Sequence, residues 1–221
     1  MTGNGTREDR IGRIILVPGL FEPRVAFAPL RHRLRRNCRR VEYFPDRVAF
    51  RSLEQSVQRM INLIRPTDDD DAIGIVTHSF GDWVTRQALA RSEDHAVTRL
   101  VSVAPVMRSG LIPIALHACS GNLIPEIRVM MDSSQAAANL DCGRTAGGGD
   151  RVKRLVIWAK ADESVRPVSL EHLSGIRVER VAATHLTVII QPNVLKMIER
   201  FLFPDGIPDR RQLQDGENPS H

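Results

Sequence analysis

Short apolar runs alternate along this chain with longer stretches in which apolar residues recur every three or four positions. A short run rich in β-branched residues is typical of a buried strand, whereas the three-to-four spacing is typical of an amphipathic helix. The runs predict strands over residues 13–17, 41–44, 73–76, 99–104, 154–159 and 177–182, and the spaced stretches predict helices over residues 25–36, 53–64, 82–91 and 193–203.

The predicted strands and helices follow one another in regular alternation. Parallel strands need crossover connections, and helices in those connections cover both faces of the sheet. We therefore predict an α/β fold, in which a mainly parallel, doubly wound sheet of about six strands forms one domain over residues 13–204. Polar tails at residues 1–12 and 205–221 flank this domain. Ligands on such sheets bind at the carboxyl ends of the strands, so functional side chains are expected there.

The alternation fails between residues 106 and 150. This segment contains prolines and clustered glycines and fits no simple strand–helix unit, so we interpret it as a cap or lid insertion. Its apolar side chains would suit either an adaptable lid around an acyl chain or a packed cap without a substrate role, and both interpretations stay open. These side chains belong to Met107, Leu111, Ile112, Ile114, Leu116, Leu123, Ile124, Met130 and Met131.

Composition and charge change this picture little. The 221 residues are 42% hydrophobic and 26% charged, which is typical of a globular protein. The net charge of +5 comes largely from an arginine-rich stretch at residues 31–40, which has few aromatic residues for stacking bases. We interpret it as a solvated surface and expect no nucleic-acid partner, while a weak association with acidic or lipid surfaces remains open.

No residue pattern indicates a metal site or a cofactor. Cys38, Cys119 and Cys142 share no metal-binding spacing, and an odd number argues against a full disulfide framework, so free thiols are expected. The four aspartates at residues 68–71 point in different directions and are interpreted as a solvated loop. The polar start lacks the apolar region of a secretory signal, and no run is long enough to span a membrane, so we expect a cytoplasmic protein.

Ser79 is the first candidate for chemistry. It lies in the sequence Thr-His-Ser-Phe-Gly at residues 77–81, between a predicted buried strand and a predicted helix. A glycine-x-serine-x-glycine turn in this position lifts the serine above the strand end as a nucleophile, although Thr77 replaces the first glycine here. The following helix would place its N-terminal dipole and the Phe80 N–H beside developing negative charge. An ordinary serine turn that caps a helix is the alternative.

A nucleophilic serine needs a base, and the base needs a carboxylate to fix its tautomer. Asp162 follows the predicted strand at residues 154–159, and His185 follows the one at residues 177–182, so both fall at strand ends. Glu163 is a second candidate carboxylate. His78 is disfavoured as the base, because adjacent residues in a turn point apart.

These segments together resemble the α/β-hydrolase superfamily, and within it the small lipase- and esterase-like members. The resemblance runs from Ile14 to about Phe203. It is carried by residues 16–20 (Leu-Val-Pro-Gly-Leu), residues 77–81, residues 101–105 with 108–110, residues 158–162 with Val165 and Pro167, and residues 184–185. Pro18, Thr77 and Lys160 depart from the residues usual in the family.

The resemblance implies a function and its site. It implies a serine esterase of the carboxylesterase or lipase type, with the chain order Ser79, Asp162 and His185 and no cofactor. The loop after the first strand would supply a second oxyanion donor, for which we favour the Leu20 N–H over that of Phe21. The substrate would be a small-molecule ester or acyl compound, and a thioester or amide would fit the same triad. The alternative of another class is a non-catalytic binding protein with this fold.

Overall fold

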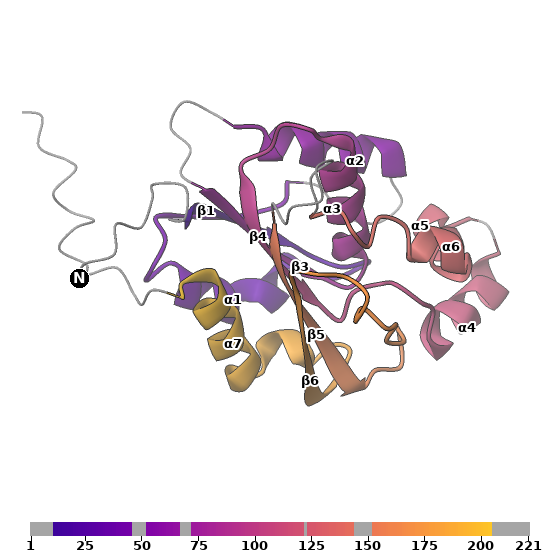
Figure 1. Ribbon diagram of the computed structural model, residues 1–221. Coiled ribbons are helices and arrows are strands. Elements are labelled where there is room, and N and C mark those ends of the chain that lie inside the picture. Colours follow the sequence, from indigo (N-terminus) through magenta and orange to yellow (C-terminus); the bar gives the residue numbers. More distant parts are fainter. Residues whose placement is uncertain (1–10, 46–51, 67–71, 122, 144–151, 205–221) are drawn as a thin grey trace, which may run out of the picture.

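Six parallel strands form one sheet in the order β2-β1-β3-β4-β5-β6 (Figure 1). The computed structural model describes residues 11–45, 52–66, 72–121, 123–143 and 152–204. The strands are β1 (Ile11–Val17), β2 (Arg40–Tyr43), β3 (Ala72–His78), β4 (Val97–Val103), β5 (Lys153–Ala161) and β6 (Ile176–Thr184). Each overlaps a predicted strand, which confirms the predicted fold class. β1 begins at Ile11, slightly before the predicted domain boundary at residue 13.

Helices cover both faces of this sheet. Helices α2 (Leu53–Ile64) and α3 (Phe80–Arg91) lie on one face, and α1 (Ala28–Leu34) and α7 (Pro192–Leu202) lie on the other (Figure 1). The side chain of Ser52 caps α2 by accepting a hydrogen bond from the Gln55 N–H. Val57 and Ile64 of the stripe predicted for α2 are buried, its third residue, Ile61, is half-buried, and Met60 is buried beside them.

The first predicted helix is split in the structure. Residues Arg24–Phe27 form a 3-10 helix, η2, and α1 begins only at Ala28. Pro29 stands in the first turn of α1, where its missing N–H leaves no intrahelical hydrogen bond unmade. A second 3-10 helix, η3 (Val188–Ile190), precedes α7.

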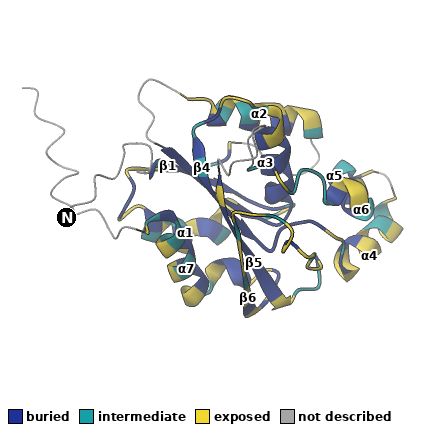
Figure 2. Cartoon of the chain, viewed as in Figure 1, coloured by how far each residue is buried: buried dark blue, intermediate teal, exposed yellow. Residues whose placement is uncertain are grey.

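The segment between β4 and β5, for which we keep the name insertion from the sequence interpretation, contains three short helices in its described part. They are α4 (Leu111–Ser120), α5 (Pro125–Met131) and α6 (Ser133–Ala136), which the sequence pattern did not predict. Figure 2 shows that the central strands are buried, whereas α4 is largely exposed. Of the ten residues of α4, Pro113 is the buried one. Residues 122 and 144–151, the aspartates at 68–71 and the tails at 1–10 and 205–221 lie outside the described residues.

Several arginines of the basic stretch have structural partners. Arg33 Nε donates to Glu199 Oε2 at 2.6 Å and thereby ties α1 to α7. Arg31 lies over the Tyr43 ring, with its guanidinium carbon 5.1 Å from the ring centroid. The three cysteines are free thiols, as predicted, and Cys38 and Cys142 are buried. Within the described part of the chain, no helix is long and apolar enough to cross a membrane.

Candidate active site

Ser79 has the backbone conformation of a sharp turn between β3 and α3. Its φ is 52° and its ψ is −124°, a region that residues with a side chain rarely adopt. Its N–H donates to the Val103 carbonyl at 3.0 Å, and its side chain makes no capping hydrogen bond to α3. The alternative of an ordinary capping serine is therefore wrong. α3 begins at Phe80, two residues earlier than predicted, so its N-terminus lies directly beside Ser79.

Glycine is required at two positions near this turn, because neighbouring atoms leave no room for a Cβ atom there. A Cβ atom on Gly81 would lie 2.6 Å from the carbonyl oxygens of Val17 and Pro18, and a Cβ on Gly19 would lie 2.8 Å from the Cβ of Ser79. Real Cβ contacts are essentially never this short, so larger residues would force the loops apart. The loop after β1 therefore packs directly against Ser79.

Thr77 fits the turn although the sequence motif usually has glycine there. It belongs to β3, is fully buried, and its hydroxyl lies 3.3 Å from the Val101 carbonyl and 3.5 Å from Asp82 Oδ1. The backbone reversal falls at Ser79 rather than at Thr77, so the β-branched side chain keeps an ordinary strand conformation.

The structure brings Asp162 and His185 together. His185 Nδ1 lies 2.9 Å from Asp162 Oδ2, while Asp162 Oδ1 accepts the N–H groups of Ser164 and Val165, each at 2.8 Å. Both side chains are nearly buried, 2% exposed for Asp162 and 7% for His185. The carboxylate is thus held on one oxygen and aimed at the imidazole with the other. The described contacts of Glu163 give its carboxylate no comparable partner.

Ser79 and His185 lie at the same edge of the sheet, but the described contacts include no hydrogen bond between their side chains. In unliganded sites such bonds are often long, and they tighten when substrate binds. The link between their two loops is His78. Its Nε2 lies 3.0 Å from the His185 carbonyl, and its ring centroid lies 4.8 Å from that of His185.

The two predicted oxyanion donors belong to segments that adjoin Ser79, α3 and the loop after β1. Phe80 is the first residue of α3, so its N–H has no acceptor within the helix. No hydrogen bond of the described residues takes the Leu20 N–H as donor. Phe21, the second choice, has a left-handed φ of 58° and is the third residue of a tight turn that the Glu22 N–H closes on the Gly19 carbonyl at 3.3 Å.

Glu22 and His78 form an ion pair that the sequence did not predict. His78 Nδ1 lies 2.8 Å from Glu22 Oε2, and the exposed fractions of the two side chains are 1% and 6%. Burial disfavours both charges, but the mutual hydrogen bond and attraction outweigh it: the pKa of Glu22 is lowered and that of His78 is raised. In the sequence, the one indication of this pair is that an acidic residue, Glu22, stands in the loop after β1.

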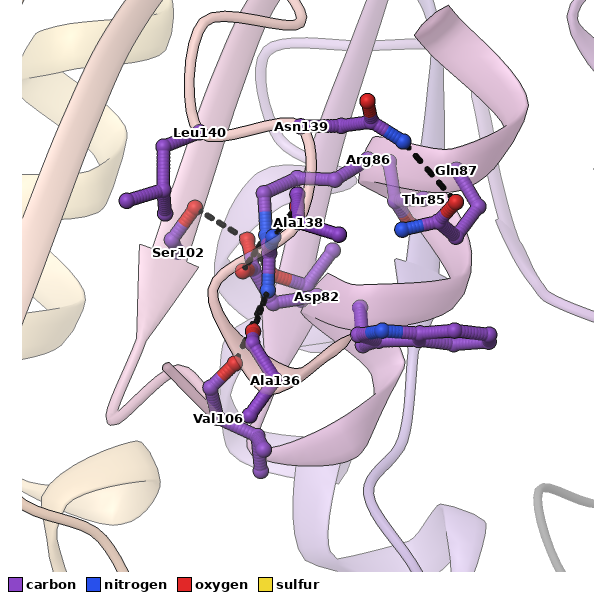
Figure 3. A network of polar contacts seen from close by, with 12 residues as sticks. Asp82, Thr85, Arg86, Gln87, Ser102, Val106, Ala136, Ala138, Asn139 and Leu140 are labelled. Carbon is purple, nitrogen blue, oxygen red and sulfur yellow. Dashed lines mark hydrogen bonds and ion pairs between the residues drawn. The ribbon is translucent and has the colours of Figure 1, made fainter. Parts of the chain in front are cut away.

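A second unpredicted cluster lies between α3 and the insertion (Figure 3). Asp82 is fully buried and pairs with Arg86 at 2.8 Å and with Arg154 at 3.1 Å. Burial opposes its ionisation, but the charges of Arg154 and Arg86 keep its pKa lowered. Ser102 Oγ also donates to Asp82, at 2.5 Å. The sequence does contain one indication of this cluster: Asp82 and Arg86 are four residues apart in a predicted helix, which places their side chains next to each other.

This cluster binds the insertion to the sheet. Figure 3 shows the Arg86 side chain running from α3 toward the inserted segment, where it donates to the carbonyls of Val106, Ala136 and Ala138. Arg154 donates to the Leu140 carbonyl at 3.0 Å. The inner part of the insertion is therefore packed, whereas α4 extends outward from it. Among the described residues, no group of three or more histidine, cysteine or acidic side chains could hold a metal ion.

No protein-family model and no curated protein matches the sequence. Solved structures do match its fold. The carboxylesterase CesB (YbfK) from Bacillus subtilis is 15% identical, with a TM-score of 0.58 over 88% of this chain and 84% of that one. The esterase Pf2001 from Pyrococcus furiosus is 12% identical, with a TM-score of 0.58 over 88% of this chain and 82% of that one.

The match extends to a larger protein. Lipase B from Aspergillus fumigatus is 14% identical, with a TM-score of 0.57 over 96% of this chain but 57% of that one. At these identities the likeness concerns the fold, and the chemistry has to be argued from the side chains.

Proposed function

Because this chain has the α/β-hydrolase fold, we propose that it is a serine hydrolase that cleaves a carboxylic ester. In this proposal Ser79 is the nucleophile, His185 the base and Asp162 the carboxylate that orients the base. The single observation that supports it most is the left-handed φ of 52° at Ser79. Such strain costs about 1–3 kcal/mol, and it persists where function requires it.

The proposed reaction is acyl transfer to water. His185 Nε2 takes the proton of the Ser79 hydroxyl as Oγ attacks the ester carbonyl, and Asp162 Oδ2 accepts the Nδ1–H and stabilises the imidazolium. The N–H groups of Leu20 and Phe80 would stabilise the oxyanion. His185 then gives its proton to the leaving alcohol, and water attacks the acyl-enzyme by the same route. Thioesters and amides could follow it as well.

We propose that the substrate carries an apolar acyl or alcohol group. Phe21 and Leu186, which adjoin the proposed oxyanion donor and base, are 51% and 67% exposed. The start of α4 is tied to the loop of Asp162, because the Leu111 N–H donates to the Glu163 carbonyl at 2.9 Å. α4 exposes further large apolar side chains, at Leu111, Ile112, Ile114 and Leu116. Together with the net charge of +5, this apolar surface would also suit weak adsorption to an acidic lipid surface.

The test is labelling with a fluorophosphonate, followed by hydrolysis of p-nitrophenyl esters from acetate to palmitate. We expect wild type to label, Ser79→Ala to lose labelling completely, and Asp162→Asn to lose about three or four orders of magnitude in kcat. Ser169→Ala, which changes an exposed serine outside every helix and strand, is the matched control and should label normally. A folded wild type that neither labels nor turns over any ester would favour the non-catalytic binding protein.

A further inference from the structure

Three loops of the candidate site converge on one buried side chain. His78 lies between the loop after β1, which it reaches through Glu22, and the loop after β6, which it reaches through the His185 carbonyl. Its own backbone precedes Ser79. Glu22 Oε2 also accepts the Gly19 N–H at 2.7 Å, so one carboxylate oxygen joins the proposed oxyanion loop to the histidine.

The contacts of His78 and the pKa directions of the pair bear together on its protonation state. The His185 carbonyl can only accept, so His78 Nε2 must carry a hydrogen. Glu22 Oε2 also accepts the Gly19 N–H, and one proton has to lie between this oxygen and Nδ1. Although burial disfavours both charges, the lowered pKa of Glu22 and the raised pKa of His78, both caused by their hydrogen bond and mutual attraction, favour that proton on Nδ1. A histidine that donates from both nitrogens is an imidazolium.

We propose that His78 is a positioning residue: as an imidazolium held between Glu22 and the His185 carbonyl, it fixes the oxyanion loop and the base relative to Ser79. This clamp rests on the proposed function, because it has a role only if Ser79 reacts. It does not touch the substrate. It acts through Gly19 on one side and through the backbone of His185 on the other.

The loops have a physical need for such a clamp. Pro18 has no N–H with which to anchor the loop after β1, and Phe21 holds a left-handed φ of 58° that a free loop would relax. The Glu22 carboxylate keeps that turn closed through the Gly19 N–H. A donor that drifts by about 1 Å can cost roughly a hundredfold in rate.

Stability alone accounts poorly for this pair. Removing two charges from water costs several kcal/mol, and an apolar pair of similar volume would often be at least as stable. The charged groups that act on His78 are the carboxylates of Glu22 and Asp162, and the ring of His185 lies beside it with the centroids 4.8 Å apart. Both carboxylates favour the imidazolium form of His78.

The activity test compares Glu22→Gln and His78→Gln with Glu199→Gln. The last variant removes an ion pair between α1 and α7, which lie on a face of the sheet rather than at its catalytic edge. We expect the first two variants to lower kcat by about 10- to 100-fold with KM changed less than about threefold, and fluorophosphonate labelling to slow in parallel. Glu199→Gln should keep the wild-type kcat.

Two further readouts separate positioning from a merely structural role. The kcat/KM of wild type should fall on the alkaline side as His78 loses its proton, and in Glu22→Gln this limb should move to lower pH. Long-range ¹H–¹⁵N correlation spectra of wild type at neutral pH should show both ring nitrogens of His78 protonated, a result that does not depend on activity.

The outcomes are distinct. A neutral His78 in the spectra overturns the clamp, and so does a folded Glu22→Gln with wild-type kcat and an unmoved alkaline limb. If Glu22→Gln does not fold, His78→Gln decides by the same kcat criterion and the spectra decide the protonation state. A wild type that neither labels nor hydrolyses overturns the proposed function, whereas a labelled wild type with fully active variants overturns the clamp alone.

Discussion

Two buried ionic clusters lie on either side of Ser79, and they differ in chemistry. Asp82, Arg86 and Arg154 form one cluster beneath the insertion, and Glu22 and His78 form the other among the loops of the candidate site. The cations of the first are guanidinium groups, which donate to backbone carbonyls of the insertion. The cation of the second is an imidazolium, which can lose its proton, and although burial opposes the charge, its pKa is raised by the hydrogen bond and charge of Glu22.

This difference in chemistry fits different roles: the Asp82 cluster holds the structure together, and the Glu22–His78 pair belongs to the candidate site. Arginine offers several donors in a rigid planar group, so the Asp82 cluster can satisfy many carbonyls at once and hold the insertion in one place. Protonated histidine offers two donors in opposite directions, which suits a link between two loops. Because the imidazolium can lose a proton, this link depends on pH. The predictions below test this separation.

The largest effect should come from Asp82→Asn. This change leaves the buried Arg86 and Arg154 without their carboxylate, and breaking a buried pair in this way costs about 3–5 kcal/mol. Urea unfolding followed by circular dichroism measures the loss in free energy of unfolding. A loss below about 1 kcal/mol would mean that the cluster is no scaffold.

The Glu22–His78 pair should give a smaller and pH-dependent effect. We expect Glu22→Gln to lower the free energy of unfolding by about 1.5–3 kcal/mol near pH 6, where both groups of the wild-type pair are charged. Because the folded pKa of His78 is raised above its ordinary 6.5, its contribution is complete below that value and is lost as pH rises through the raised pKa. Because the pKa of Glu22 is lowered from 4.5, its contribution is complete above 4.5 and is lost as pH falls through the lowered pKa.

The pH series sharpens the comparison between the clusters. The gap between wild type and Glu22→Gln should shrink as pH rises from 6.5 through the raised pKa of His78. The gap between wild type and Asp82→Asn should stay constant over that range, because the lowered pKa of Asp82 makes its contribution fall away only on the acid side. Equal behaviour of the two gaps would contradict the distinction.

Thr77→Val should have a modest effect. Valine keeps the shape of threonine but removes the hydroxyl that lies beside the Val101 carbonyl and Asp82. We expect a loss of about 1 kcal/mol in the free energy of unfolding, measured in urea. An unchanged free energy of unfolding would mean that the Thr77 hydroxyl does not contribute to the Asp82 cluster.

The smallest effect should come from Glu54→Gln, which serves as the exposed counterpart of both clusters. The side chains of the Arg91–Glu54 pair are 44% and 68% exposed, so solvent screens the attraction. We expect a change of less than about 1 kcal/mol in the free energy of unfolding. A loss comparable to that of Asp82→Asn would show that burial is not the deciding variable.

The sequence by itself determined the frame of this protein. Periodicity is a local property, so the apolar runs located all six strands, and the range predicted for α2 agreed with the observed Leu53–Ile64. Parallel strands end at a common edge, which is why the order of Ser79, Asp162 and His185 was enough to predict that they share it. The 2.9 Å contact between His185 and Asp162 agrees with that prediction.

Only the tertiary structure decided how this frame is held. Glu22 and His78 are 56 positions apart, and Asp82 and Arg154 are 72 apart, so no local pattern pairs them. A charged residue is by default expected at the surface, and its burial becomes favourable only when a partner arrives from another segment of the chain. The packing of the insertion could not be predicted for the same reason. Its backbone carbonyls accept hydrogen bonds from Arg86 of α3 and Arg154 of β5, and its own sequence does not indicate these partners.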